Sequence, residues 1–143
     1  MQIKKKEIVN SMIKCLTGGI LYFYLEIAFR GFSHYSMFLC GGICFAIISE
    51  FGKQVLKNNN NIIPVILKIM FVGSLVITTL EYITGIIFNV YLGQEVWDYS
   101  DLKYNVDGQI CAIYSLLWAV LSLICVCFGE VLEKFVFNDE RTK

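Results

Sequence analysis

The longest apolar run of the chain, residues 65–90, reads VILKIMFVGSLVITTLEYITGIIFNV. A membrane-spanning helix needs roughly 20 mostly apolar residues, and this run is longer than that. Its charged residues are Lys68 near the start and Glu81 in the second half. The run therefore predicts a transmembrane helix that tilts or extends past the membrane. It also raises the question of why a glutamate lies inside it.

Three further apolar runs, residues 11–29, 35–51 and 109–128, are each close to the length of a membrane span. The chain has 143 residues, of which 57% are hydrophobic, and a soluble domain of this length could not bury so much apolar surface. We therefore predict an all-α membrane protein, with residues 1–143 forming one transmembrane domain of four helices arranged as two helical hairpins. Lys14 lies inside the first run, and we expect its side chain to extend to the headgroups.

The distribution of charge predicts an orientation. Basic residues gather at the two termini and around the Asn-rich link at residues 58–61, whereas the loop before the last helix is mainly acidic. By the positive-inside rule, both termini and this link face the cytoplasm, and the acidic loop faces outward. The basic residues in these regions are Lys4, Lys5, Lys6, Lys14, Lys53, Lys57, Lys68, Lys134, Arg141 and Lys143. The start of the chain resembles a signal peptide but lacks an A-x-A cleavage site, so we expect a retained first helix in a multi-pass protein of the cell membrane.

Composition argues against several classes of function. The formal net charge is zero, so no basic patch indicates nucleic-acid binding. The six cysteines lie in apolar segments without a C-x-x-C motif, and the chain has one histidine. This pattern predicts packing cysteines rather than a metal site, and no cofactor is implied. No P-loop motif occurs in the sequence, so we expect any ATPase to be a separate chain.

Polar and small residues form stripes on two predicted helices. Ser74, Thr78, Glu81, Gly85 and Asn89 follow one face of the third helix. The fourth helix has a similar stripe of Gly108, Ala112, Ser115, Ala119 and Ser122. Stripes of this kind usually pack helices against one another in lipid.

Short motifs suggest an internal repeat. LE, HYS and GGIC in the first half recur in order as LE, DYS and GQIC in the second half. Both halves are expected to start in the cytoplasm, so the repeat would be parallel, about an axis along the membrane normal. Chance similarity is the alternative for matches this short.

Two glutamates are the main candidates for a polar site. An ionised carboxylate facing lipid at the position of Glu81 would cost about 2.5–3.5 kcal/mol, so Glu81 should face the bundle. Glu26 can pair with Arg30 one turn later, and His34 lies nearby in sequence. We predict a polar site in the outer half of the bundle, with Asp98 as a cap. Two further candidates in the outer loop are Tyr99 and Asn105.

The second half of the chain carries motifs that resemble the putative type IV ABC-transporter family, also called CmpB-like, of small bacterial membrane proteins. The matching elements are E-Y-x-x-G at Glu81, Tyr82 and Gly85; WDYS at residues 97–100; N-x-x-G-x-I-C at Asn105, Gly108, Ile110 and Cys111; and SLLW at residues 115–118. After Arg30 and Gly31, the first half lacks the prolines that the family often shows. The resemblance therefore covers about the C-terminal half.

The resemblance implies a permease-like role, and the leading hypothesis is a small transporter component with an outward polar site. Four helices leave little room for a closed path, so transport would favour a homodimer. A separate ATPase or membrane partner is also implied. The first alternative is a non-transporting interaction or regulatory subunit whose ion-pair cluster is structural. A small intramembrane enzyme is the third hypothesis; we assign no catalytic residue, because no nucleophile motif accompanies the carboxylates.

Overall fold

The computed structural model describes residues 2–58 and 60–137. They form α1 (Gln2–Arg30), α2 (Tyr35–Asn58), α3 (Ile62–Gly85) and α4 (Ala112–Phe137). A π-helix, η1 (Ile86–Tyr91), continues α3, and two short strands, β1 (Asn105–Val106) and β2 (Ile110–Cys111), pair antiparallel in the loop before α4. Arg141 and Lys143, which contribute to the basic charge of the C-terminus, lie outside the described residues.

Four helices are long and apolar enough to cross a membrane, over Lys6–Arg30, Tyr35–Asn58, Ile62–Tyr91 and Ala112–Val136. This confirms the predicted all-α membrane class. Many large apolar side chains point away from the protein, including Phe71, which is 72% exposed, and Phe135, which is 89% exposed. Such an exterior suits lipid tails and would be costly in water.

The helix ends follow from local sequence. The side chain of Asn61 accepts a hydrogen bond from the backbone N–H of Ile63 and caps the start of α3. At the end of α1, Gly31 adopts a φ of +79° and its N–H donates to Ile27, a left-handed conformation that suits glycine. The apolar run of the last helix starts at residue 109, but α4 begins only at Ala112, because residues 109–111 belong to the β1–β2 hairpin.

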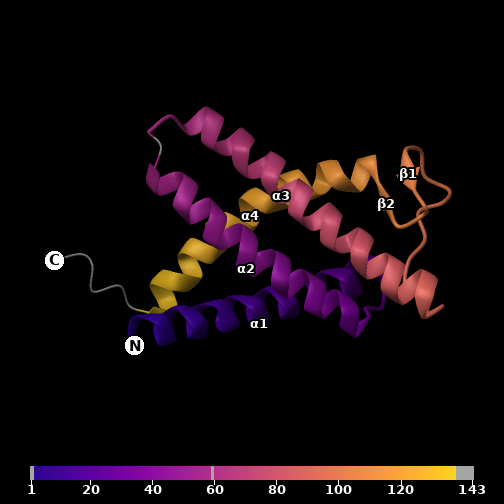
Figure 1. Cartoon of the computed structure of the whole chain (residues 1–143), viewed down its shortest axis with the longest axis horizontal. Helices are drawn as coiled ribbons and strands as arrows, with labels where there is room; N and C mark the ends of the chain where they lie inside the picture. Colours follow the sequence, from indigo (N-terminus) through magenta and orange to yellow (C-terminus); the bar gives the residue numbers. More distant parts are fainter. Residues whose placement is uncertain (1, 59, 138–143) are drawn as a thin grey trace.

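The helices form a bundle in which α2 is central (Figure 1). α1 lies along α2, α3 packs on α4, and α2 contacts both α3 and α4, whereas α1 and α4 touch little. The start of α1 and the end of α4 lie at one end of the bundle, here called the terminal end; the loop of residues 92–111 lies at the other, called the loop end (Figure 1).

The apolar core joins α2, α3 and α4. Its buried residues include Cys44 and Ile48 of α2, Val65 and Ile69 of α3, and Val126 of α4. The internal repeat stays a prediction. Its GGIC motif at residues 41–44 is helical, whereas the matching GQIC at residues 108–111 lies in the turn and strand before α4.

Candidate functional site

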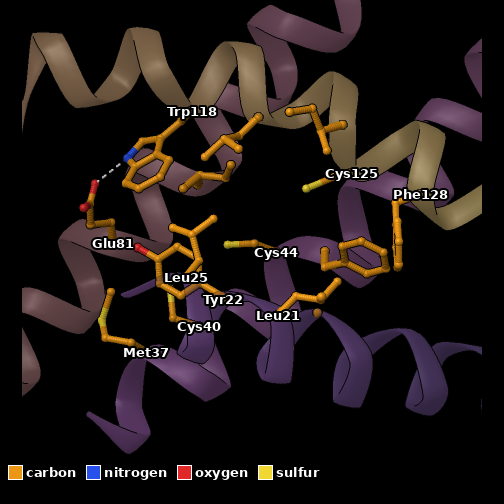
Figure 2. Close-up of a pocket in the computed structure, with 16 residues that line it drawn as sticks. Leu21, Tyr22, Leu25, Met37, Cys40, Cys44, Glu81, Trp118, Cys125 and Phe128 are labelled. Atoms are coloured by element: carbon orange, nitrogen blue, oxygen red, sulfur yellow. Dashed lines mark hydrogen bonds between the residues drawn. The ribbon is translucent and has the colours of Figure 1, made fainter. Parts of the chain in front are cut away.

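Glu81 is buried inside the bundle, with 2% of its surface exposed. The hydroxyl of Tyr99 donates a hydrogen bond to Oε1 at 3.0 Å. The indole Nε1–H of Trp118 donates to Oε2 at 2.8 Å (Figure 2). The expected inward orientation is therefore present. The partners come from the loop of residues 92–111 and from α4, whereas Arg30 and His34 make other contacts. In the described part of the chain, no lysine or arginine is paired with Glu81.

Aromatic rings surround this carboxylate. Trp118 lies edge-on to Tyr22 of α1, at 6.1 Å between ring centroids, and stacks with Tyr114 one turn earlier on α4. Tyr114 in turn stacks on Tyr99, at 4.7 Å. Burial raises the pKa of the Tyr99 hydroxyl, and the nearby Glu81 carboxylate raises it further. Tyr99, one of the candidate site residues named from the sequence, thus remains a neutral donor to Glu81.

Glu26 and Arg30 form a second polar group at the loop end. Their closest charged atoms are 3.6 Å apart, and the hydroxyl of Ser33 donates to Glu26 at 2.7 Å. Arg30 also donates to the backbone carbonyl of Val96 at 3.3 Å, which ties α1 to the loop of residues 92–111. The predicted i, i+4 pair is present. His34 instead contacts Ser36, at 2.8 Å between Nδ1 and Oγ.

The two other loop candidates organise the loop itself. Asp98 is exposed and accepts hydrogen bonds from the backbone N–H and the hydroxyl of Ser100, which lower the pKa of its carboxyl group. Asn105 donates to the carbonyls of Ser100 and Leu102 and accepts from Gly108. The expected capping of the site by Asp98 is therefore not seen; the neighbouring residue Tyr99 covers Glu81 instead.

The polar stripe of α3 faces α4 and the loop. Ser74 donates to the carbonyl of Ser115 at 2.6 Å, and Thr78 donates to the Ser115 hydroxyl at 3.0 Å. One turn beyond Gly85, Asn89 donates to the carbonyl of Trp97 and to the side chain of Gln109, and it accepts from the backbone N–H of Val96. These contacts make the stripe a packing and positioning face, and those of Asn89 hold the loop backbone at Val96 and Trp97, next to Tyr99.

A cavity of about 300 Å³ begins at Glu81 and runs between α1, α2 and α4 (Figure 2). Glu81, Tyr22 and Trp118 lie toward one end and Phe128 toward the other (Figure 2). The walls between them are apolar or sulfur-containing, and include Met37, Cys40, Cys44 and Cys125. Glu81 is the one lining side chain with a full charge when ionised, so the cavity is an apolar chamber with a carboxylate at one end.

A second charged cluster lies at the terminal end and was not predicted. Lys14 is 2% exposed and pairs with Glu133 of α4, at 2.5 Å, and with Glu50 of α2, at 3.1 Å. Lys53 also pairs with Glu133, at 2.5 Å. The expectation that Lys14 extends to the headgroups is wrong, because carboxylates on two neighbouring helices compensate its charge inside the protein. The cluster ties α1, α2 and α4 together.

The cysteines within the described residues are free thiols, and those residues contain no group of three or more metal-ligating side chains. Three of the thiols, on Cys40, Cys44 and Cys125, line the cavity. They contribute small polarizable surface there, as their apolar sequence surroundings predicted.

The family model described as "Putative ABC-transporter type IV" matches residues 12–141. The chain belongs to this family. The match spans both halves of the chain, so the motif resemblance, which reached only the C-terminal half, underestimated its extent. Comparisons with curated proteins and with solved structures found no match. Membership in the family and the four long apolar helices make the chain a multi-pass membrane protein.

Proposed function

We propose that the protein is the membrane-embedded component of a transporter, and that the cavity beside Glu81 receives the substrate. One observation carries this proposal: an apolar cavity lies within the four spans and has a buried carboxylate at one end. Ligand sites are typically cavities of about 300–1,000 Å³ with few polar groups. Glu26 and Arg30 extend the polar region toward the loop end.

The family description supports a separate ATPase partner for the chain. A second copy is also proposed, because four helices alone leave little room for a path closed to lipid. We further propose a cell-membrane location, with both termini and residues 58–61 in the cytoplasm. The positive-inside argument supports that orientation. A cysteine introduced at Gln94 should react with an impermeant maleimide added to intact cells, and one at Asn60 should not; the reverse pattern would invert the orientation.

A structural role for the carboxylate is the alternative that a specific observation favours. Both oxygens of Glu81 accept hydrogen bonds from donors within the protein, as they would if Glu81 only fixed the docking of α3 against α4. A non-transporting interaction subunit would need nothing more. Transport, by contrast, requires water to reach the cavity at some stage of the cycle.

Water access to the cavity can be measured at its native thiols. Two single-cysteine chains are compared, one that retains only Cys125 and one that retains only Cys127, with the other cysteines replaced by alanine. Cys125 lines the cavity, whereas Cys127, two residues later, is exposed on the outside of the bundle. Water-soluble methanethiosulfonate reagents react with thiols that water reaches, since the thiolate is the nucleophile.

For a transporter, Cys125 should be labelled in energised cells that contain the native partners, and labelling should fall when the cells are depleted of ATP. Cys127 serves as the matched control and should stay unlabelled in both states, because it faces lipid. If Cys125 is unreactive from either side of the membrane under all conditions, the transport proposal fails and the structural role is favoured.

A further inference from the structure

The mouth of the cavity is built from apolar residues on two helices that barely touch. Leu21 and Leu25 are one turn apart on α1, and Ile124 and Phe128 are one turn apart on α4. All four are between 38% and 57% exposed, whereas Cys44, Glu81 and Trp118 in the interior are at most 5% exposed. The cavity therefore opens sideways through the gap between α1 and α4.

This opening faces lipid rather than water. The four rim residues lie well inside the spans of α1 and α4, where the surroundings of a membrane protein are acyl chains. A molecule that enters by this route must first dissolve in the bilayer. The occupant therefore needs an apolar body, for which the leucine, phenylalanine and cysteine walls are suited.

The closed end of the cavity restricts the charge of the ligand. The hydrogen-bond partners of Glu81 are a phenol and an indole, and neither neutralises the charge of an ionised carboxylate. Glu26 is near enough to repel Glu81 electrostatically, and its own partner is Arg30. Glu26 and Arg30 are paired outside the cavity lining, so the charge at this end is that of the Glu81 carboxylate. A cation is complementary to that charge, and an anion would be repelled.

The aromatic rings at this end favour the same ligand. Tyr22 and Trp118 line the cavity on either side of the carboxylate end, and indole and phenol faces attract organic cations, more strongly when water is excluded. We propose that the cavity binds a lipophilic cation, with an apolar body between α1 and α4 and its positive charge beside Glu81. This inference rests on the proposed function and names the class of its substrate.

The test is equilibrium binding to the purified full chain in lipid nanodiscs, so it requires no transport. Tritiated tetraphenylphosphonium is the probe, and empty nanodiscs give the lipid background. Tetraphenylborate has nearly the same shape and the opposite charge, which makes it the matched competitor. We expect saturable binding above the background, with tetraphenylborate competing at least about tenfold more weakly than unlabelled tetraphenylphosphonium.

Four variants locate the site. Glu81→Gln keeps an oxygen acceptor for Trp118 and removes the charge, and it should weaken binding at least about tenfold, equivalent to about 1.4 kcal/mol. Asp101→Asn, which removes an exposed loop charge, should leave binding unchanged. Cys125→Trp fills the cavity and should abolish binding, whereas Cys127→Trp, on the outside of α4, should not.

Binding no greater than in empty nanodiscs would overturn the inference. Equal competition by tetraphenylborate, or full binding by Glu81→Gln or by Cys125→Trp, would also overturn it. If Glu81→Gln does not fold, the Cys125→Trp and Cys127→Trp pair still decides the location and tetraphenylborate still decides the charge. Saturable binding together with an inaccessible Cys125 in cells would retain the cation site and reject transport, so the two proposals fail separately.

Discussion

The indole N–H of Trp118 lies 2.8 Å from Oε2 of Glu81, and both residues are buried. This contact joins α3 to α4 across 37 residues of sequence. It explains how a carboxylate can lie within an apolar run: one oxygen accepts from Trp118 and the other from Tyr99. Buried polar groups without partners are costly, so these two donors make the position of Glu81 tenable whether its role is binding or structural.

The two glutamates at the loop end should differ in their energetic coupling to Arg30. Arg30 is 3.6 Å from Glu26, and its other contacts are a hydrogen bond to the carbonyl of Val96 and the ring of Phe32. In double-mutant cycles in detergent, Glu26→Gln and Arg30→Gln should couple by about 0.5 kcal/mol or more, whereas Glu81→Gln and Arg30→Gln should be additive within about 0.5 kcal/mol. Strong coupling of Arg30 with Glu81 would show that the ion pair is wrongly assigned.

Lys14 should contribute more to stability than other lysines of the terminal end. Lys14→Met removes the charge that compensates Glu50 and part of Glu133, although Lys53 still pairs with Glu133. We expect a loss of about 1–3 kcal/mol in the free energy of unfolding, below the usual cost of breaking a buried pair because of that remaining partner. Lys57→Met, at an exposed position, should change stability by about 0.5 kcal/mol at most. Similar losses in the two variants would contradict a buried Lys14.

The close approach of α3 and α4 depends on Gly73. A Cβ atom at this position would overlap the side chain of Ser122. Gly73→Ala should therefore lower the free energy of unfolding by about 1–3 kcal/mol, as overpacking does. Adding Ser122→Gly opens the space and should recover part of that loss, measured by thermal unfolding in detergent. If the double variant is as unstable as the sum of the single variants, the two residues are not in contact.

The loop of residues 92–111 should respond to pH through Asp98. Hydrogen bonds from Ser100 lower the pKa of this carboxyl group. The ionised form therefore stabilises the loop above the ordinary pKa of aspartate, and this support is lost as the pH falls through the lowered value. Ser100→Ala should raise the Asp98 pKa toward its ordinary value in an NMR titration of the side-chain carboxyl carbon, whereas Ser100→Thr should largely preserve it. An unchanged Asp98 titration in Ser100→Ala would contradict the contact.

Sequence alone predicted those features of the site that depend on a single helix. The cost of a carboxylate in lipid was enough to orient Glu81 inward, and i, i+4 spacing was enough to pair Glu26 with Arg30. Trp118 could not be identified as the partner of Glu81. Its indole reaches Glu81 because of the angle at which α3 and α4 cross and because α4 begins after β2, and neither feature follows from the pattern of one helix. The motif SLLW marked the residue without indicating its contact.

Lys14 was misjudged for a related reason. Seen on one helix, a lysine within an apolar run should extend toward water. Its partners, Glu50 and Glu133, lie on α2 and α4. The sequence of each helix alone did not indicate that these three side chains meet. The cavity was equally hidden, because it is formed by the separation of α1 from α4, which no pattern within either helix records.

Trp118 holds Glu81 inside the bundle, and the chain allows a direct measurement of this contact with an internal control. It contains two tryptophans, Trp97 and Trp118, and the indole N–H of Trp97 donates instead to the carbonyl of Gln109, at 2.9 Å. In a ¹⁵N-resolved NMR spectrum of the indole N–H groups, Glu81→Gln should shift the Trp118 signal clearly and leave the Trp97 signal nearly in place. A Trp118 signal that does not move, or equal shifts of both signals, would contradict the account.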